Sequence, residues 1–232
     1  MAKHVYHRTD ALLTLARRAI SSETLDHVQT PIQLEIARSY RRFKRAKGSN
    51  GQDSTIDDEC ERIEELLGLA FGATQSYITT FRTRIATLSN ACKEDFGQGL
   101  SFSTNPKGFD VLQRGDPFRV GVPYSTVQVV NAIANYWKHQ EDWPLREEKQ
   151  GRWLRSVWDA AGVTPIERRT IEIVTAIGMT PLSTGNLRLA AEILGATDYR
   201  DLSQIRTKVT DWAEALYQDA RLELARLQSG AK

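Results

Sequence analysis

The 232-residue sequence lacks any run of about 18 apolar residues, the length that a membrane-spanning helix requires. Its first ten residues, MAKHVYHRTD, also lack the apolar core of a secretory signal peptide. We therefore expect a cytoplasmic protein with no membrane partner. The net charge is only +2, so the overall charge does not by itself indicate a nucleic-acid partner.

Cysteine is scarce, with only Cys60 and Cys92 in the chain. If both lie on one continuous helix, a rise of about 1.5 Å per residue separates them by roughly 48 Å, which excludes an intrachain disulfide. Neither has a Cys or His partner at zinc-ligand spacing. The phosphate-binding loop, the dinucleotide fingerprint and the Ser-His-Asp pattern are also missing. We expect two buried thiols, no metal site and no cofactor.

What the sequence does contain is helical periodicity. In the segment Asp57 to Phe96, apolar or small residues recur at steps of three and four, and a second such seam covers Leu202 to Leu227. These seams fit either the spine of a bundle or a dimer interface. The first seam comprises Cys60, Ile63, Leu67, Ala70, Thr74, Tyr77, Phe81, Ile85, Leu88 and Cys92. The second comprises Leu202, Ile205, Val209, Trp212, Leu216, Ala220, Leu224 and Leu227.

We therefore predict an all-α fold, a single antiparallel helical bundle over residues 1–232. A possible subdivision separates residues 1–144 from a C-terminal helical extension, 145–232. Besides the two seams, shorter helices are expected over residues 9–20, 23–47, 125–142, 146–161, 164–177 and 187–194. The stretch GSNGQDS (48–54) is predicted to be a linker between helices.

Several residues carry signals for helix ends. Pro31 predicts a helix start or a kink inside residues 23–47. Ser125 can cap the helix that follows it, and Thr164-Pro165-x-Glu167 is typical of a capping box. Asn186 is expected to cap the helix over 187–194, which Gly195 should end.

Residues 97–124 differ from the rest of the chain because they are rich in Gly and Pro and show no helical period. We predict a long ordered loop with a short hairpin around residues 109–122. Loops of this length in compact domains are often functional.

The stretch NAIANYWKHQEDWP (131–144) follows that loop. On a helical wheel, Asn131, Asn135, Lys138, His139 and Asp142 share one face. The opposite face is apolar: Val129, Val130, Ile133, Ala134, Tyr136 and Trp137. The polar face is either an ordinary solvated surface or a site.

The residue types on this face suit metal-independent RNA cleavage, in which a 2′-hydroxyl attacks the neighbouring phosphate. His139 can accept or donate a proton near neutral pH. Lys138 can stabilise charge that develops on the phosphate. Asn131 and Asn135 can orient these groups. Because one His per chain supplies one proton-transfer group, a second copy across a two-fold axis is expected.

The segment NAIANYWKH resembles the motif of the HEPN superfamily of all-α proteins. That motif begins with an Arg, which is usually followed by a polar residue such as Asn, and it ends with a His after four to six further residues. His139 corresponds to the motif His, and Asn131 or Asn135 to the polar position. No Arg lies in residues 129–138, so the nearby cations are Lys138 and the more distant Arg119. The resemblance implies a dimeric ribonuclease of toxin–antitoxin or phage-defence systems, with an antitoxin or defence-system partner, or else an inactive adaptor.

Residues 35–47, EIARSYRRFKRAK, form the densest basic stretch of the chain. Its cations, with Arg119, are candidates for binding the RNA backbone. The alternative is a solvated helix end whose cations complement the helix dipole. The candidates are Arg38, Arg41, Arg42, Lys44, Arg45 and Arg119.

Two further functions stay open. The chain could be a non-catalytic interaction protein that uses its two long seams to bind itself or a partner. Residues 187–205 have the helix–Gly–helix form of a DNA-binding helix-turn-helix, in which the acidic Asp198 and Asp201 disfavour a phosphate surface.

Overall fold

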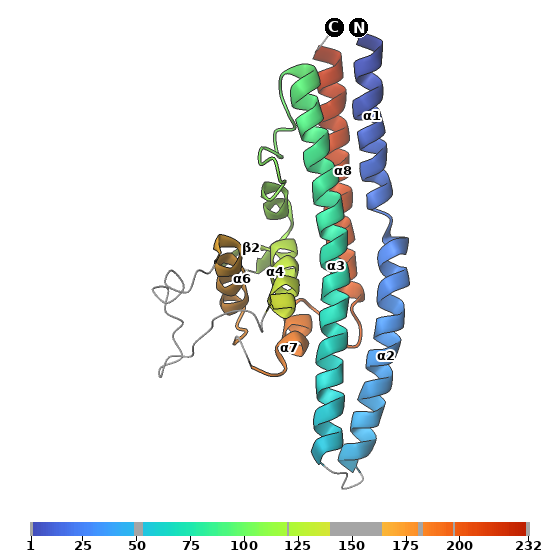
Figure 1. Cartoon of the computed structure of the whole chain (residues 1–232), viewed down its shortest axis with the longest axis vertical. Coiled ribbons are helices and arrows are strands. Elements are labelled where there is room, and N and C mark those ends of the chain that lie inside the picture. Colours follow the sequence, from blue (N-terminus) through green and yellow to red (C-terminus); the bar gives the residue numbers. More distant parts are fainter. Residues whose placement is uncertain are drawn as a thin grey trace. The chain divides into compact units, whose positions relative to one another are not determined.

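The computed structural model describes residues 2–48, 53–119, 121–139, 164–180, 183–196 and 198–230 (Figure 1). The all-α prediction is confirmed, since the described chain is mostly helical and has one small hairpin. The helices are α1 (Ala2–Ala19), α2 (Ser22–Gly48), α3 (Asp53–Phe96), η1 (Asp110–Arg114), α4 (Thr126–His139), α6 (Pro165–Ala176), α7 (Asn186–Ile193) and α8 (Ser203–Gly230). The helix predicted over 146–161 lies outside the described residues.

The chain divides into two compact units, each assembled from segments that are far apart in the sequence. The first unit comprises Met1–Val28, Ala73–Gln128 and Ile205–Lys232. The second comprises Gln29–Gly72 and Val129–Gln204.

In the first unit, α1 runs antiparallel to both α3 and α8. Arg8, near the start of α1, pairs with Glu94 near the end of α3 at 2.9 Å. Asp10 of α1 accepts a hydrogen bond from Gln228, near the end of α8, at 3.0 Å. Because α3 and α8 each oppose α1, they run in the same direction.

The core of this unit contains polar groups whose hydrogen bonds are satisfied internally. Tyr77 of α3 donates to the Ile20 carbonyl at 3.1 Å, where α1 ends. Phe81 meets Trp212 of α8 edge-on, with ring centroids 5.5 Å apart. The indole N–H of Trp212 donates to the Val111 carbonyl at 3.2 Å and so ties η1 to α8. These bonds remove the cost of burying the hydroxyl and the indole N–H.

Both predicted seams are buried in the chain's own core. On α3 every seam position is buried except Cys60, and on α8 every one except Leu227, both of which are half-buried. The seams therefore form the spine of the fold, and their apolar surface is already covered by intrachain packing.

The loop after α3 is ordered, as predicted, and is anchored on α3. The Ser89 hydroxyl accepts from the Leu100 N–H at 3.0 Å and donates to the Ser103 carbonyl at 2.8 Å. Beyond η1, the strands β1 (Pro117–Arg119) and β2 (Val122–Ser125) pair antiparallel. The predicted hairpin is therefore present, but it lies later than residues 109–122, because residues 110–114 form η1.

The predicted cap at Ser125 and the predicted capping box at Thr164 are both confirmed, and the cap at Ser125 is also a reciprocal box. Ser125 accepts from the Gln128 N–H at 3.1 Å, while the Gln128 side chain accepts from the Ser125 N–H at 2.9 Å. Thr164 and Glu167 make the same reciprocal pair at the start of α6. The helix start expected at Pro31 is wrong, because α2 continues through it. Buried Leu25 and Ile36 on either side hold the helix in the core.

The cap expected from Asn186 is also wrong. Gly185 occupies the N-cap of α7, and the Asn186 side chain is buried, donating to the Thr180 carbonyl at 2.7 Å. The carboxylate of Glu64, on α3, instead accepts the N–H groups of Leu187 and Arg188, at 2.8 and 3.3 Å. The end at Gly195 is confirmed, with φ of 97° and its N–H bonded to the Glu192 carbonyl.

Candidate functional site

The helix that carries the predicted site is fixed by its apolar face. The predicted division into two faces is confirmed, because five apolar positions of α4 are buried: Val129, Val130, Ile133, Ala134 and Tyr136. The Tyr136 hydroxyl accepts from the Asn186 side chain at 3.2 Å. Trp137 is half-buried against Gly68 and Gly72 of α3. These contacts orient the opposite face of α4.

The polar residues lie on that opposite face and differ in how exposed they are. Lys138 and His139 are exposed in the last described turn, whereas Asn135 one turn earlier and Asn131 two turns earlier are half-buried. The Cε atom of Lys138 lies 3.7 Å from the point where a Cβ on Gly72 would be, so its aliphatic chain runs along α3. Asp142 and the predicted end of this helix lie outside the described residues.

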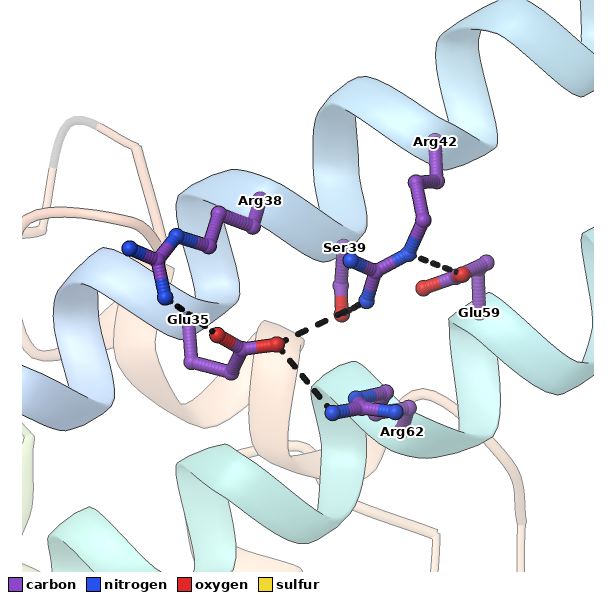
Figure 2. A network of polar contacts seen from close by, with 6 residues as sticks. All are labelled: Glu35, Arg38, Ser39, Arg42, Glu59 and Arg62. Carbon is purple, nitrogen blue, oxygen red and sulfur yellow. Dashed lines mark hydrogen bonds and ion pairs between the residues drawn. The ribbon is translucent and has the colours of Figure 1, made fainter.

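The basic segment of α2 is partly engaged in a network with α3, drawn in Figure 2. Glu35 accepts from Arg38 and from Arg62 of α3, each at 3.1 Å. Arg42 pairs with Glu59 of α3 and also lies 3.6 Å from Glu35. These pairs show that α2 and α3 run antiparallel here.

The network shifts the acidity of its carboxyl groups. The hydrogen bond from Arg38 lowers the pKa of Glu35, against an opposing effect of burial and with help from the charges of Arg62 and Arg42. The hydrogen bond from Arg42 likewise lowers the pKa of Glu59. Both carboxylates are therefore ionised at neutral pH and attract the two helices to each other.

The remaining cations of this segment are exposed, namely Arg41, Lys44, Arg45 and Lys47. Lys44 lies 5.7 Å from the centroid of the Tyr40 ring. These cations are evident in the sequence of α2, but only the antiparallel arrangement brings the acidic start of α3 alongside them. Seven acids lie there: Asp53, Asp57, Asp58, Glu59, Glu61, Glu64 and Glu65. Of the basic charge on α2, Arg42 is thus engaged directly with an acid of α3, Glu59.

The structure does not bring all predicted residues into one unit. Arg119 is exposed in β1, with its guanidinium 5.3 Å from the Phe118 ring. It belongs to the first compact unit, whereas Asn131, Asn135, Lys138 and His139 belong to the second.

The cations of the possible helix-turn-helix segment are already paired. Its two helices, α7 and α8, are separated by residues 194–202. The ion pairs are Arg188–Glu64, Arg200–Asp198 and Arg206–Asp26. These arginines would have to leave their carboxylates to contact a phosphate backbone.

Within the described ranges, no group of three or more His, Cys, Asp or Glu side chains could hold a metal ion. In the same part of the chain, no helix combines the length and apolar character needed to cross a bilayer. Comparisons with known proteins found no matching family model, no matching curated protein and no matching solved structure. The functional argument therefore depends on the geometry of the site itself.

Proposed function

We propose that this chain is a metal-independent ribonuclease that acts as a toxin or defence effector. The observation that carries the proposal is the pair of exposed side chains, Lys138 and His139, at the end of a helix whose opposite face is firmly packed. An imidazole and an ammonium group accessible to a large substrate are the two groups that this chemistry needs.

In the proposed reaction, His139 accepts the proton of a ribose 2′-hydroxyl as that oxygen attacks the adjacent phosphorus. The P–O5′ bond breaks, leaving a 2′,3′-cyclic phosphate, and the departing 5′-oxygen takes up a proton. Lys138 stabilises the charge on the phosphate oxygens during the attack. A homodimer would supply the second imidazole as the acid, and Asn131 and Asn135 would orient the phosphate.

The experiment compares wild type with His139→Ala and Lys138→Ala, using growth after induction and RNA integrity in vivo and with purified protein. General acid–base catalysis contributes at least about a hundredfold, so His139→Ala should reduce cleavage by that factor or more. His27→Ala is the matched control, because His27 is an exposed histidine of α2 outside the site. Equal cleavage by wild type and His139→Ala, or none by either, rules the proposal out.

A second candidate is a non-catalytic helical protein that binds RNA or a protein partner. It is favoured by the lack of an Arg in residues 129–138, where the resembling family carries one. The seams of α3 and α8 are buried within the chain, so a partner would bind another surface of this protein in the second candidate function. Binding that survives His139→Ala unchanged would favour this second function.

A further inference from the structure

Arg82, on α3, is a half-buried arginine with no balancing carboxylate among the described residues. Its Nε atom is buried and has no hydrogen-bond partner in the same part of the chain. Burial lowers the pKa of its guanidinium, since removal from water disfavours the charged form. Four of the five other half-buried arginines in the described ranges, all except Arg168, each hold a carboxylate: Arg42, Arg188, Arg200 and Arg206. Arg82 therefore differs from them in lacking the anion that would offset its desolvation.

An aromatic ring lies against this guanidinium. The Cζ atom of Arg82 is 4.2 Å from the centroid of Phe109, whose side chain is nevertheless 38% exposed. The preceding residue, Gly108, has φ of 66°, and a Cβ there would lie 3.0 Å from Cγ of Arg82 and 3.1 Å from Cβ of Ala86. Only glycine fits this close approach, so the loop backbone lies directly on α3 beside Arg82.

The loop that presents Phe109 is closed by Asp110. Its carboxylate accepts the N–H groups of Thr104, Asn105 and Val111, at 2.5, 2.8 and 3.1 Å. Burial raises the pKa of this carboxyl group, but the hydrogen bonds from Asn105 and Thr104 outweigh it and bring the pKa below its usual value. The carboxylate thus stays ionised at neutral pH and holds Phe109 in place over Arg82.

The part of α3 that carries Arg82 has no acidic residues, and the carboxylate of Asp110 in the loop is already occupied by backbone N–H groups. No Asp or Glu occurs in residues 66–93, although seven occur in the first turns of the same helix. Lys107, in the loop beside Gly108, is exposed. Thr79, one turn before Arg82 on α3, is half-buried. A guanidinium, an ammonium and a hydroxyl are all donors that a phosphate group accepts.

We propose that Arg82 and Phe109 form a nucleotide-binding site. The guanidinium binds the phosphate group, because planar N–H donors match phosphate oxygens. The exposed part of the Phe109 ring stacks with the base, as aromatic side chains do with single-stranded nucleic acid. The ligand is a nucleotide unit, either free or within an RNA strand. The site does not depend on the activity assigned to His139.

The test is calorimetric titration of the full-length chain with AMP, adenosine, inorganic phosphate and a short single-stranded RNA. The RNA is methylated at its 2′-hydroxyls, so it cannot be cleaved by attack of that group. We expect AMP or the RNA to bind saturably and adenosine to bind at least tenfold more weakly than AMP. Arg82→Met should weaken nucleotide binding at least tenfold, whereas Phe109→Leu should remove the advantage of AMP over inorganic phosphate.

Arg84→Met is the matched control, because Arg84 is exposed two residues away on the same helix and should bind as wild type does. Thermal unfolding without ligand verifies that each variant is folded, and Arg82→Lys replaces Arg82→Met if the latter is not. Binding of AMP assigns the site to free nucleotides, and binding of the RNA alone assigns it to a strand. Failure of both ligands to bind, or equal affinities of wild type and the Arg82 variant, overturns the proposal, whatever the outcome of the His139 cleavage assay.

Discussion

The indole of Trp137 lies directly on the backbone of Gly68. A Cβ atom at Gly68 would be only 2.1 Å from Cε2 and Nε1 of that ring, far inside van der Waals contact. At Gly72, one turn later on α3, the same atom would lie 3.4 Å from Cζ3, an ordinary contact. Because Gly68 has no side chain, Trp137 of α4 can pack against the backbone of α3 at this point. This contact lies immediately before Lys138 and His139.

This relationship predicts opposite effects for two chemically identical substitutions. In Gly68→Ala, overpacking costs about 1 to 3 kcal/mol, partly offset by the higher helix propensity of Ala, about 1 kcal/mol. We expect a net loss of up to about 2 kcal/mol in the free energy of unfolding. Gly72→Ala has room for the methyl group and should gain up to about 1 kcal/mol. Urea unfolding followed by tryptophan fluorescence measures both, and equal stabilisation by the two substitutions would contradict the packing described.

A second prediction separates the core of α3 from its surface. Leu67 is fully buried in the seam, whereas Leu69 is 50% exposed. Leu67→Ala should cost about 2 to 5 kcal/mol, because it leaves a cavity. Leu69→Ala should change the free energy of unfolding by no more than about 0.5 kcal/mol. Chemical denaturation of both variants at the same protein concentration measures the two free energies of unfolding. Equal losses of stability would mean that Leu67 and Leu69 are equally buried.

The helices and their buried faces could be predicted from the sequence because their signals repeat or are local. The seams on α3 and α8 repeat over many turns, so one misjudged position does not change the pattern. The capping boxes at Ser125–Gln128 and Thr164–Glu167 are also local, since both partners lie within four residues.

Pairings over long sequence separations could not be predicted in this way. Asn186 has the right residue type for a cap, but Glu64, 123 residues before Leu187, takes that role. The buried environment instead gives the Asn186 amide a carbonyl and a hydroxyl to bond. Local preference favoured Asn186, and tertiary contacts overrode it.

In the candidate sites, too, the features set by local sequence could be predicted and those set by long-range packing could not. The two faces of α4 follow from helical periodicity, so the polar residues could be named in advance. The pairing of Arg42 with Glu59 depends on the antiparallel packing of α2 on α3, which a count of cations on α2 cannot reveal. No motif in the sequence marks Arg82. The one sequence feature that points to it is the long stretch of α3 without acidic residues.

A third prediction concerns acid stability. The hydrogen bond from Arg42 keeps the pKa of Glu59 below its ordinary value of 4.5 in the folded chain. The ionised carboxylate therefore stabilises the fold above about pH 4.5, and this contribution is lost as the pH falls through the lowered folded pKa. Glu59→Gln removes it, so the variant should have a lower melting temperature than wild type at neutral pH. The difference should shrink as the pH falls below about 4.5 and towards the lowered folded pKa.

Thermal unfolding across this pH range, followed by circular dichroism, makes the measurement. Glu61→Gln is the control, because Glu61 is an exposed acid two residues further along α3 with no ion pair to a described residue. Its melting temperature should match wild type at every pH. A difference between Glu59→Gln and wild type that stays constant down to about pH 3 would show that the ionised pair is not its cause.

The fourth prediction uses the two free cysteines, which lie on the same helix in different surroundings. Cys92 is fully buried, and burial, assisted by the charges of Asp95 and Glu223, raises its pKa to about 11. Cys60 is half-buried. Because the thiolate is the reactive form, iodoacetamide at about pH 8 should modify Cys60 in the folded chain and leave Cys92 intact. Mass spectrometry of the peptides measures both sites, with guanidinium-unfolded chain as the control in which both react. Labelling of Cys92 as fast as Cys60 without denaturant would show that the α3 seam opens in solution at its C-terminal end.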